Sequence, residues 1–104
     1  MLEIDDRNYA EVVEKNPGLI VLDFGATWCQ PCKKLEPILE ELTAVYEGRA
    51  LIAHCDVAKG PATAQRFKVM SVPTVVFLKK GEMVDRFIGL QSRAKVVEMI
   101  DKNI

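Results

Sequence analysis

The chain has 104 residues, of which 49% are hydrophobic, and this length suits one compact domain over residues 1–104. Its 14 basic and 15 acidic residues give a net charge of -1 without any basic block, so we expect no nucleic-acid partner. The acidic amino terminus lacks a signal-peptide pattern, and no apolar run approaches the roughly 20 residues of a membrane helix. We therefore expect a cytoplasmic monomer without membrane contact.

The beginning of the chain predicts a helix followed by a buried strand. Apolar residues recur with helical spacing over 9–13, behind two aspartates suited to capping, and this helix should end near residues 16–18. Residues 19–24 are apolar at every position except Asp23. A run that is apolar on both faces is typical of a central parallel strand covered by helices.

The middle of the chain predicts a long helix, a strand and a short helix. The long helix begins near Cys29 and continues past Pro37, where we expect a kink rather than an end. Residues 50–56 predict a strand, and residues 61–67 predict a short helix. The apolar positions that hold the long helix together are Leu35, Ile38, Leu39, Leu42, Val45 and Tyr46.

The last part of the chain predicts a β-hairpin and a final helix. Residues 74–78 and 83–88 are rich in β-branched and aromatic residues and are joined by residues 79–82. Ser92 is suited to cap the last helix, whose predicted buried face is formed by Val96, Val97, Ile100 and Ile104. The order predicts an α/β domain in which a mixed sheet of about five strands is flanked by about four helices.

Two cysteines stand where the buried strand gives way to the long helix. If Cys29 occupies the N-cap of this helix, its sulfur can accept the backbone N–H of Cys32. This hydrogen bond and the positive end of the helix dipole both favour the thiolate over the thiol. Such positions lower a cysteine pKa from about 8.5 toward 7. Pro31 falls in the first turn, where its missing N–H has no intrahelical partner to lose. The placement therefore favours a reactive thiolate at Cys29.

Other readings of the cysteine pair are a structural disulfide and a metal site. Residues three apart on a helix have Cβ atoms roughly 5–6 Å apart, close enough for a disulfide that opens and closes in place. A disulfide around so short a loop stabilises by only about 2 kcal/mol, which is a poor reason for this spacing. Zinc needs about four ligands, and the remaining candidates, His54 and Cys55, should point to opposite faces of a strand, so we expect no metal. An odd number of cysteines also favours a reducing compartment.

Three motifs follow one another along nearly the whole chain. They are Val21-Leu22-Asp23-Phe24 leading to Trp28-Cys29-Gln30-Pro31-Cys32-Lys33, then Val72-Pro73-Thr74, then Gly81 and Gly89. This ordered set resembles the thioredoxin family. The resemblance implies a thioredoxin fold, reversible reduction of protein disulfides and recharging by a thioredoxin reductase. It implies no cofactor beyond the redox-active Cys29–Cys32 disulfide, with Cys29 attacking and Cys32 resolving.

The resemblance also implies a buried acid and a substrate-binding loop. Asp23 matches an acid that exchanges a proton with the second cysteine, and burial would raise its pKa toward neutrality. The alternative is an aspartate that caps the next helix. Val72 and Pro73 match a loop with a cis-proline, whose preceding backbone pairs with extended substrate. An apolar collar would be completed by Trp28, Pro31, Ile88 and Gly89, although each of these could equally be ordinary packing.

Several positions depart from the family pattern. Gly25 stands where tryptophan is usual, Ser71 replaces a common glycine, and Gln30 replaces the usual glycine between the cysteines, where it would tune the pair. His54 stands where many members carry lysine. Histidine changes charge between about pH 5 and 8, so His54 either titrates together with Asp23 or packs at a strand end without that coupling.

Two functional alternatives to a disulfide reductase remain. A thioredoxin-like interaction module would use its cysteines to regulate binding rather than to turn over. A disulfide oxidase or isomerase is the third hypothesis, although such relatives more often carry histidine between the cysteines and are exported. Two interpretations of Cys55 remain: a buried apolar packing residue, or a redox sensor.

Overall fold

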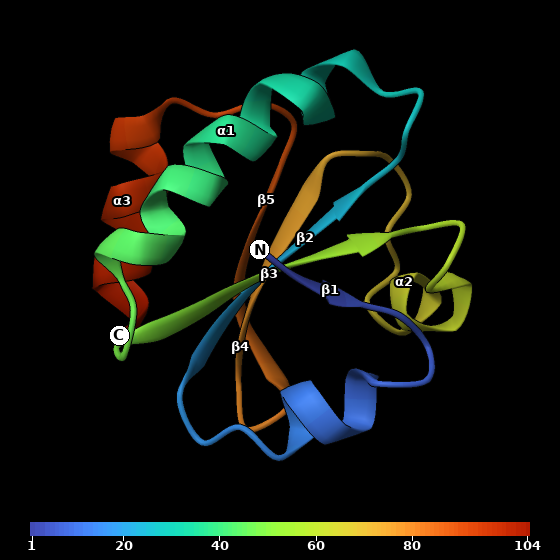
Figure 1. The fold of residues 1–104 in the computed structure, drawn as a ribbon, viewed down its shortest axis with the longest axis horizontal. Coiled ribbons are helices and arrows are strands. Elements are labelled where there is room, and N and C mark those ends of the chain that lie inside the picture. The colour runs from blue at the N-terminus through green and yellow to red at the C-terminus, as the bar shows by residue number, and fades with distance from the viewer.

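The computed structural model describes all 104 residues as a mixed sheet between two helical layers (Figure 1). The strands are β1 (Leu2–Ile4), β2 (Leu19–Gly25), β3 (Ala50–Asp56), β4 (Thr74–Lys79) and β5 (Glu82–Ile88), in the order β1-β3-β2-β4-β5. The first three are parallel, whereas β4 and β5 form an antiparallel hairpin. The predicted α/β fold with five strands and four helices is confirmed, and none of the helices is long and apolar enough to span a membrane.

The helices cover the two faces of the sheet in pairs. On one face lie α1 (Gln30–Val45) and α3 (Arg93–Asn103), and on the other lie η1 (Ala10–Glu14) and α2 (Pro61–Arg66) (Figure 1). Because side chains alternate along a strand, β2 sends Leu19 and Val21 into the first layer and Ile20 and Leu22 into the second. By the same alternation, Asp23 points toward α1.

The buried half of each helix explains why these segments are helical. α1 runs through Pro37 without ending, as predicted, and buries Cys32, Leu35, Leu39 and Leu42. Ser92 caps α3 by accepting a hydrogen bond from the Lys95 N–H at 3.2 Å.

The β4–β5 turn consists of Lys80 and Gly81, both at positive φ, which is the geometry of a tight hairpin turn.

Three details of the fold differ from the sequence-based prediction. The short strand β1 was not expected, because three residues are too few to show an alternating pattern. The first helix is a single π-type segment of five residues rather than a longer α-helix. The burial of Ile104 was wrong, since α3 ends at Asn103 and Ile104 is 49% exposed, while Met99 packs in the core.

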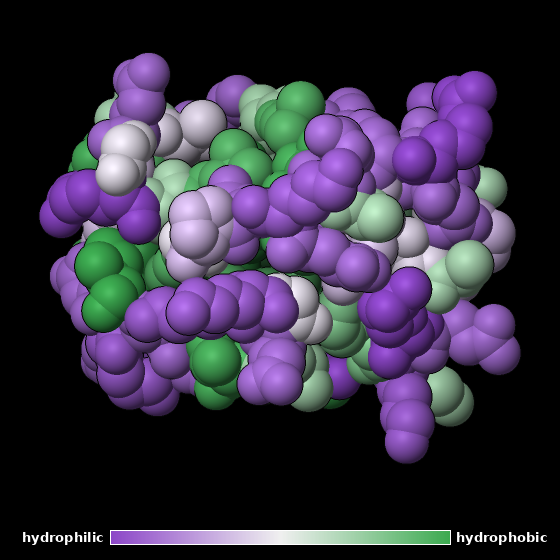
Figure 2. Space-filling view, turned by 90° about the horizontal axis from the view of Figure 1, so that it is seen from below, coloured by the Kyte–Doolittle hydropathy of each residue, from purple (hydrophilic) through white to green (hydrophobic).

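The end of the molecule that lies at the bottom of Figure 1, where η1 is found, carries mostly polar side chains. Figure 2 shows this end from below, on the side away from the beginning of α1. Hydrophilic side chains cover most of it, and hydrophobic ones gather only in small areas. This face therefore offers no broad apolar surface.

Candidate functional site

Cys29 occupies the N-cap of α1, as predicted. Its backbone is extended, with φ −93° and ψ 112°, and its sulfur accepts a hydrogen bond from the Cys32 N–H at 3.2 Å. Pro31 lies in the first turn. The sulfur therefore faces a backbone donor and the positive end of a 16-residue helix, both of which favour a thiolate over a thiol.

The two cysteines are joined by a disulfide and differ in exposure. Their Cα atoms lie 5.3 Å apart. Cys32 is completely buried, whereas Cys29 retains a small exposed area of 4%. The Cys29 sulfur also lies 3.6 Å from the carbonyl oxygen of Val72. Only the Cys29 side of the disulfide therefore opens toward an incoming sulfur.

Asp23 is a buried carboxyl group without a hydrogen-bond partner. It is wholly inaccessible, and neither carboxylate oxygen is hydrogen-bonded. Burial raises the pKa of Asp23 to about 7, while the charge of His54 lowers it and the charges of Glu36 and Glu3 raise it further. The alternative of Asp23 as a helix cap is wrong, because Cys29 caps α1. A carboxyl with this pKa can both accept and give a proton near neutral pH.

A loop before β4 lies against the disulfide. The Val72–Pro73 peptide bond is cis, and Val72 packs against the cluster formed by the two cysteines and Ala26. The Gly89 N–H donates to the Pro73 carbonyl oxygen at 2.8 Å, which holds the end of β5 beside this loop. The structure thus brings Val72, Pro73 and Gly89 together next to Cys29.

Exposed side chains surround this loop. Trp28 is 75% exposed directly before Cys29, and Ile88 is 56% exposed directly before Gly89. Gln30 and Pro31 are exposed on the first turn of α1. Large apolar side chains left in water next to a reactive sulfur form a surface suited to a protein partner.

His54 and Cys55 point to opposite faces of the sheet, as expected for neighbours on a strand. His54 pairs in register with Asp23 and faces α1. Cys55 is fully buried in the layer of η1 and α2, where burial raises its pKa to about 12. A thiol with so high a pKa stays protonated, which agrees with an apolar packing residue. No group of three potential ligand side chains is placed to hold a metal ion.

Two carboxylates near the site were missed by the sequence analysis. Glu36 lies one turn after Cys32 on α1, and its carboxylate is 3.5 Å from His54 Nε2. This i, i+4 spacing from Cys32 was a signal that the sequence offered. Glu3 lies on the unexpected strand β1, with its carboxylate 3.0 Å from His54 Nδ1. Nothing in the sequence pattern marked Glu3.

Comparisons with known proteins agree with this geometry. The family model described as Thioredoxin matches residues 1–102. The chain is 41% identical over 104 residues to a protein named Thioredoxin from Staphylococcus haemolyticus, and equally to one from Staphylococcus aureus. Each alignment covers 100% of this chain and 98% of the relative. The chain belongs to the thioredoxin family and is a thiol–disulfide oxidoreductase that reduces protein disulfides by dithiol–disulfide exchange.

Proposed function

We propose that Cys29 is the attacking thiolate and Cys32 the resolving thiol in the reduction of protein disulfides. The observation that carries this assignment is the difference between the two sulfurs. Cys29 caps the helix and reaches the surface, whereas Cys32 is completely buried behind it. A thiolate must both form and meet its substrate, and only Cys29 has the position for both.

The reaction moves two electrons from the cysteine pair to the substrate. The Cys29 thiolate attacks one sulfur of the substrate disulfide, that S–S bond breaks, and the other substrate sulfur leaves and takes up a proton. Cys32 then loses its proton and attacks the Cys29 sulfur. The Cys29–Cys32 disulfide forms, and the second substrate thiol is released.

Asp23 serves as the proton acceptor for Cys32 in the second step. Cys32 is buried, so its thiol needs a base within the protein rather than water. Asp23 points toward α1, which carries Cys32, and its pKa of about 7 matches a group that works near neutral pH. The return of the proton in the reverse reaction follows the same route.

The surface around the disulfide binds the substrate. We assign substrate contacts to Trp28, Pro31, Val72, Pro73, Ile88 and Gly89, and a tuning role to Gln30, which is exposed between the cysteines. The Val72 carbonyl next to the Cys29 sulfur supplies a backbone acceptor for an extended substrate segment. Burial of the Trp28 ring on binding supplies apolar contact.

Replacing Trp28 with alanine is expected to raise KM for a disulfide-bonded protein about fivefold or more, with kcat nearly unchanged, since aromatic interface residues often contribute over about 1 kcal/mol. Steady-state reduction in the presence of excess dithiol measures both constants. Val84→Ala is the matched control, because Val84 is 47% exposed near the far turn of the hairpin. Equal KM values for the two variants would contradict the assigned surface, and Cys29→Ser should show only the rate of the free dithiol.

Partners follow from the family. Thioredoxins use their cysteine pair without an external cofactor, act on disulfide substrates and are re-reduced by a thioredoxin reductase. For this chain we propose the same reductase class and a cytoplasmic monomer consisting of a single domain over residues 1–104. Its net charge of -1 suits neither nucleic acid nor an anionic membrane surface. A light-scattering mass of 11.7 kDa would support the monomer, and twice that mass would contradict it.

A further inference from the structure

A row of three ionisable side chains crosses the sheet from its edge to its centre. The strand registers place Glu3 of β1 opposite His54 of β3, and His54 opposite Asp23 of β2. Partners in register share a face of the sheet, so all three side chains lie on the α1 side. Exposure falls along the row, from 64% for the Glu3 side chain to 13% for His54 and none for Asp23. The row therefore leads from solvent to the buried acid.

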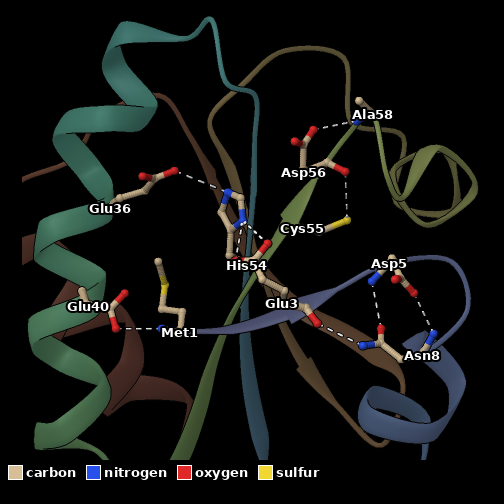
Figure 3. A network of polar contacts seen from close by, with 10 residues as sticks. All are labelled: Met1, Glu3, Asp5, Asn8, Glu36, Glu40, His54, Cys55, Asp56 and Ala58. Atoms are coloured by element: carbon tan, nitrogen blue, oxygen red, sulfur yellow. Dashed lines mark hydrogen bonds and ion pairs between the residues drawn. The ribbon is translucent and has the colours of Figure 1, made fainter.

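Two carboxylates hold the His54 ring (Figure 3). The Glu3 oxygens lie 3.0 and 3.1 Å from Nδ1, and the Glu36 Oε1 lies 3.5 Å from Nε2. The contact with Glu36 is at ion-pair distance but makes no hydrogen bond, because Nε2 has no hydrogen-bond partner. Beside this group, the amino terminus of Met1 pairs with Glu40 at 2.7 Å and fastens the end of β1 to α1.

Gly25 leaves room for the ring next to the buried cysteine. A Cβ on Gly25 would lie 3.0 Å from His54 Nε2 and 3.6 Å from the Cys32 sulfur, so both atoms face one small space at the end of β2. A tryptophan at this position would fill that space. The absence of a side chain at Gly25 and the presence of an imidazole at position 54 are therefore complementary.

The unpaired polar atoms of the interior concentrate in this row. The buried side-chain atoms that lack hydrogen bonds are the Tyr9 hydroxyl, both oxygens of Asp23 and Nε2 of His54. Unpaired buried polar atoms cost stability, and their clustering at a reactive site points to a role in function. The inner nitrogen of His54 and the acid beside it are both free to exchange a proton.

We propose that His54 is a proton-relay residue that connects the buried Asp23 and Cys32 with solvent through Glu3, with Glu36 beside the nitrogen that takes up the proton. The proposal rests on the proposed role of Asp23. Asp23 can accept the proton that Cys32 loses in its attack on Cys29 only after Asp23 has given up its own proton. Neutral His54 takes that proton at Nε2, and the opposite nitrogen, Nδ1, releases a proton beside the Glu3 carboxylate. Histidine is suited to this because its two nitrogens can carry a proton in and out on opposite sides.

Ionisable side chains from three elements surround His54. Those that face it are Glu3 from β1, Asp23 from β2, and Glu36 and Cys32 from α1. Three of these four are carboxyl groups, which can exchange a proton with the imidazole. The charge of His54 lowers the pKa of Asp23, so the two side chains interact electrostatically.

The test is the pH dependence of the resolving step in His54→Gln, which keeps a polar side chain but cannot titrate. Preformed mixed disulfides between Cys29 and a substrate, made with the Cys32 thiol held reduced at low pH, are jumped to pH 5–9, and release of substrate is followed. We expect release near pH 7 to slow about tenfold or more and the profile to lose one ionisation between pH 5 and 8. Carbon NMR of the Asp23 carboxyl group should show a higher pKa than in the wild type.

Matched variants separate the relay from structural effects. His54→Lys keeps a positive charge without titrating in this range, so it should lower the Asp23 pKa yet still lose the ionisation. Glu36→Gln should shift the profile, whereas Glu41→Gln should leave it unchanged, because Glu41 pairs with Arg93 on α3. The relay would be overturned if the pH profile of substrate release in His54→Gln superimposed on that of the wild type. It would also be overturned if the release rate fell by the same factor at every pH. Failure of the wild-type mixed disulfide to resolve through Cys32 would instead contradict the proposed function.

Discussion

Cys32→Ser is expected to stop turnover at the mixed disulfide with the substrate. Without the second thiol, the bond between Cys29 and the substrate sulfur can be cleaved only by a thiol from solution. Well-placed intramolecular groups act at effective concentrations far above any added dithiol, so turnover should fall on the order of a hundredfold or more. Incubation with a disulfide-bonded protein, followed by non-reducing electrophoresis and peptide mapping, measures the trapped species and identifies the sulfur that holds it.

Two further cysteine variants are the controls for this trapping. Cys29→Ser should trap nothing, since Cys32 is buried behind the helix N-terminus. Cys55→Ser should behave like the wild type in exchange, because the Cys55 thiol lies on the opposite face of the sheet. If the Cys29 and Cys32 variants trap substrate to the same extent, the assigned roles are wrong.

We expect the oxidised Asp23→Asn variant to gain stability against unfolding relative to the oxidised wild type as pH rises. The pKa of Asp23 is raised from 3.8 to about 7 in the folded protein, so the folded state holds a proton that the unfolded chain has lost. The free energy of unfolding of the wild type therefore falls as pH rises from about 4 to 7 and levels off above that range. A shift of about three units corresponds to about 4 kcal/mol, and the variant lacks this loss.

Urea unfolding at intervals between pH 4 and 8 measures the difference between variant and wild type. Asp85→Asn is the matched control with the opposite sign, because a hydrogen bond from Asn103 and the nearby Lys102 lower the pKa of Asp85. The stability that Asp85 contributes is present above its unfolded pKa, so the Asp85→Asn difference should be constant above about pH 5. A difference for Asp23→Asn that stays equally constant would show that this carboxyl titrates normally.

The sequence predicted the centre of the site because its signals are local. The apolar run around Asp23 specified a strand buried on both faces, and Cys29 stood at the point where helical spacing begins. Cap geometry depends only on residues within one turn, so the hydrogen bond from the Cys32 N–H to the Cys29 sulfur followed from spacing alone. The cis bond before Pro73 was implied by family resemblance, since most bonds before proline are trans.

Features that depend on long-range pairing could not be predicted. Glu3 reaches His54 across 51 residues of sequence, through a strand too short to show a pattern. The space beside Gly25 is occupied by His54 only because β2 and β3 pair in one register, and a shift by one residue would turn His54 away. The end of α3 was misplaced because helical spacing alone does not mark where a terminal helix stops.

The most direct test of the central claim is the pH dependence of alkylation of the reduced wild-type protein. A limiting amount of iodoacetamide is added between pH 5 and 10, and modified cysteines are mapped by mass spectrometry. We expect Cys29 to react first, with a midpoint below the value of about 8.5 for a free cysteine, while Cys32 and Cys55 stay unmodified; thioredoxins are themselves among the known cases of such lowered cysteine pKa values. Equal reaction of Cys32, or a Cys29 midpoint at or above about 8.5, would contradict a thiolate stabilised at the N-cap of α1.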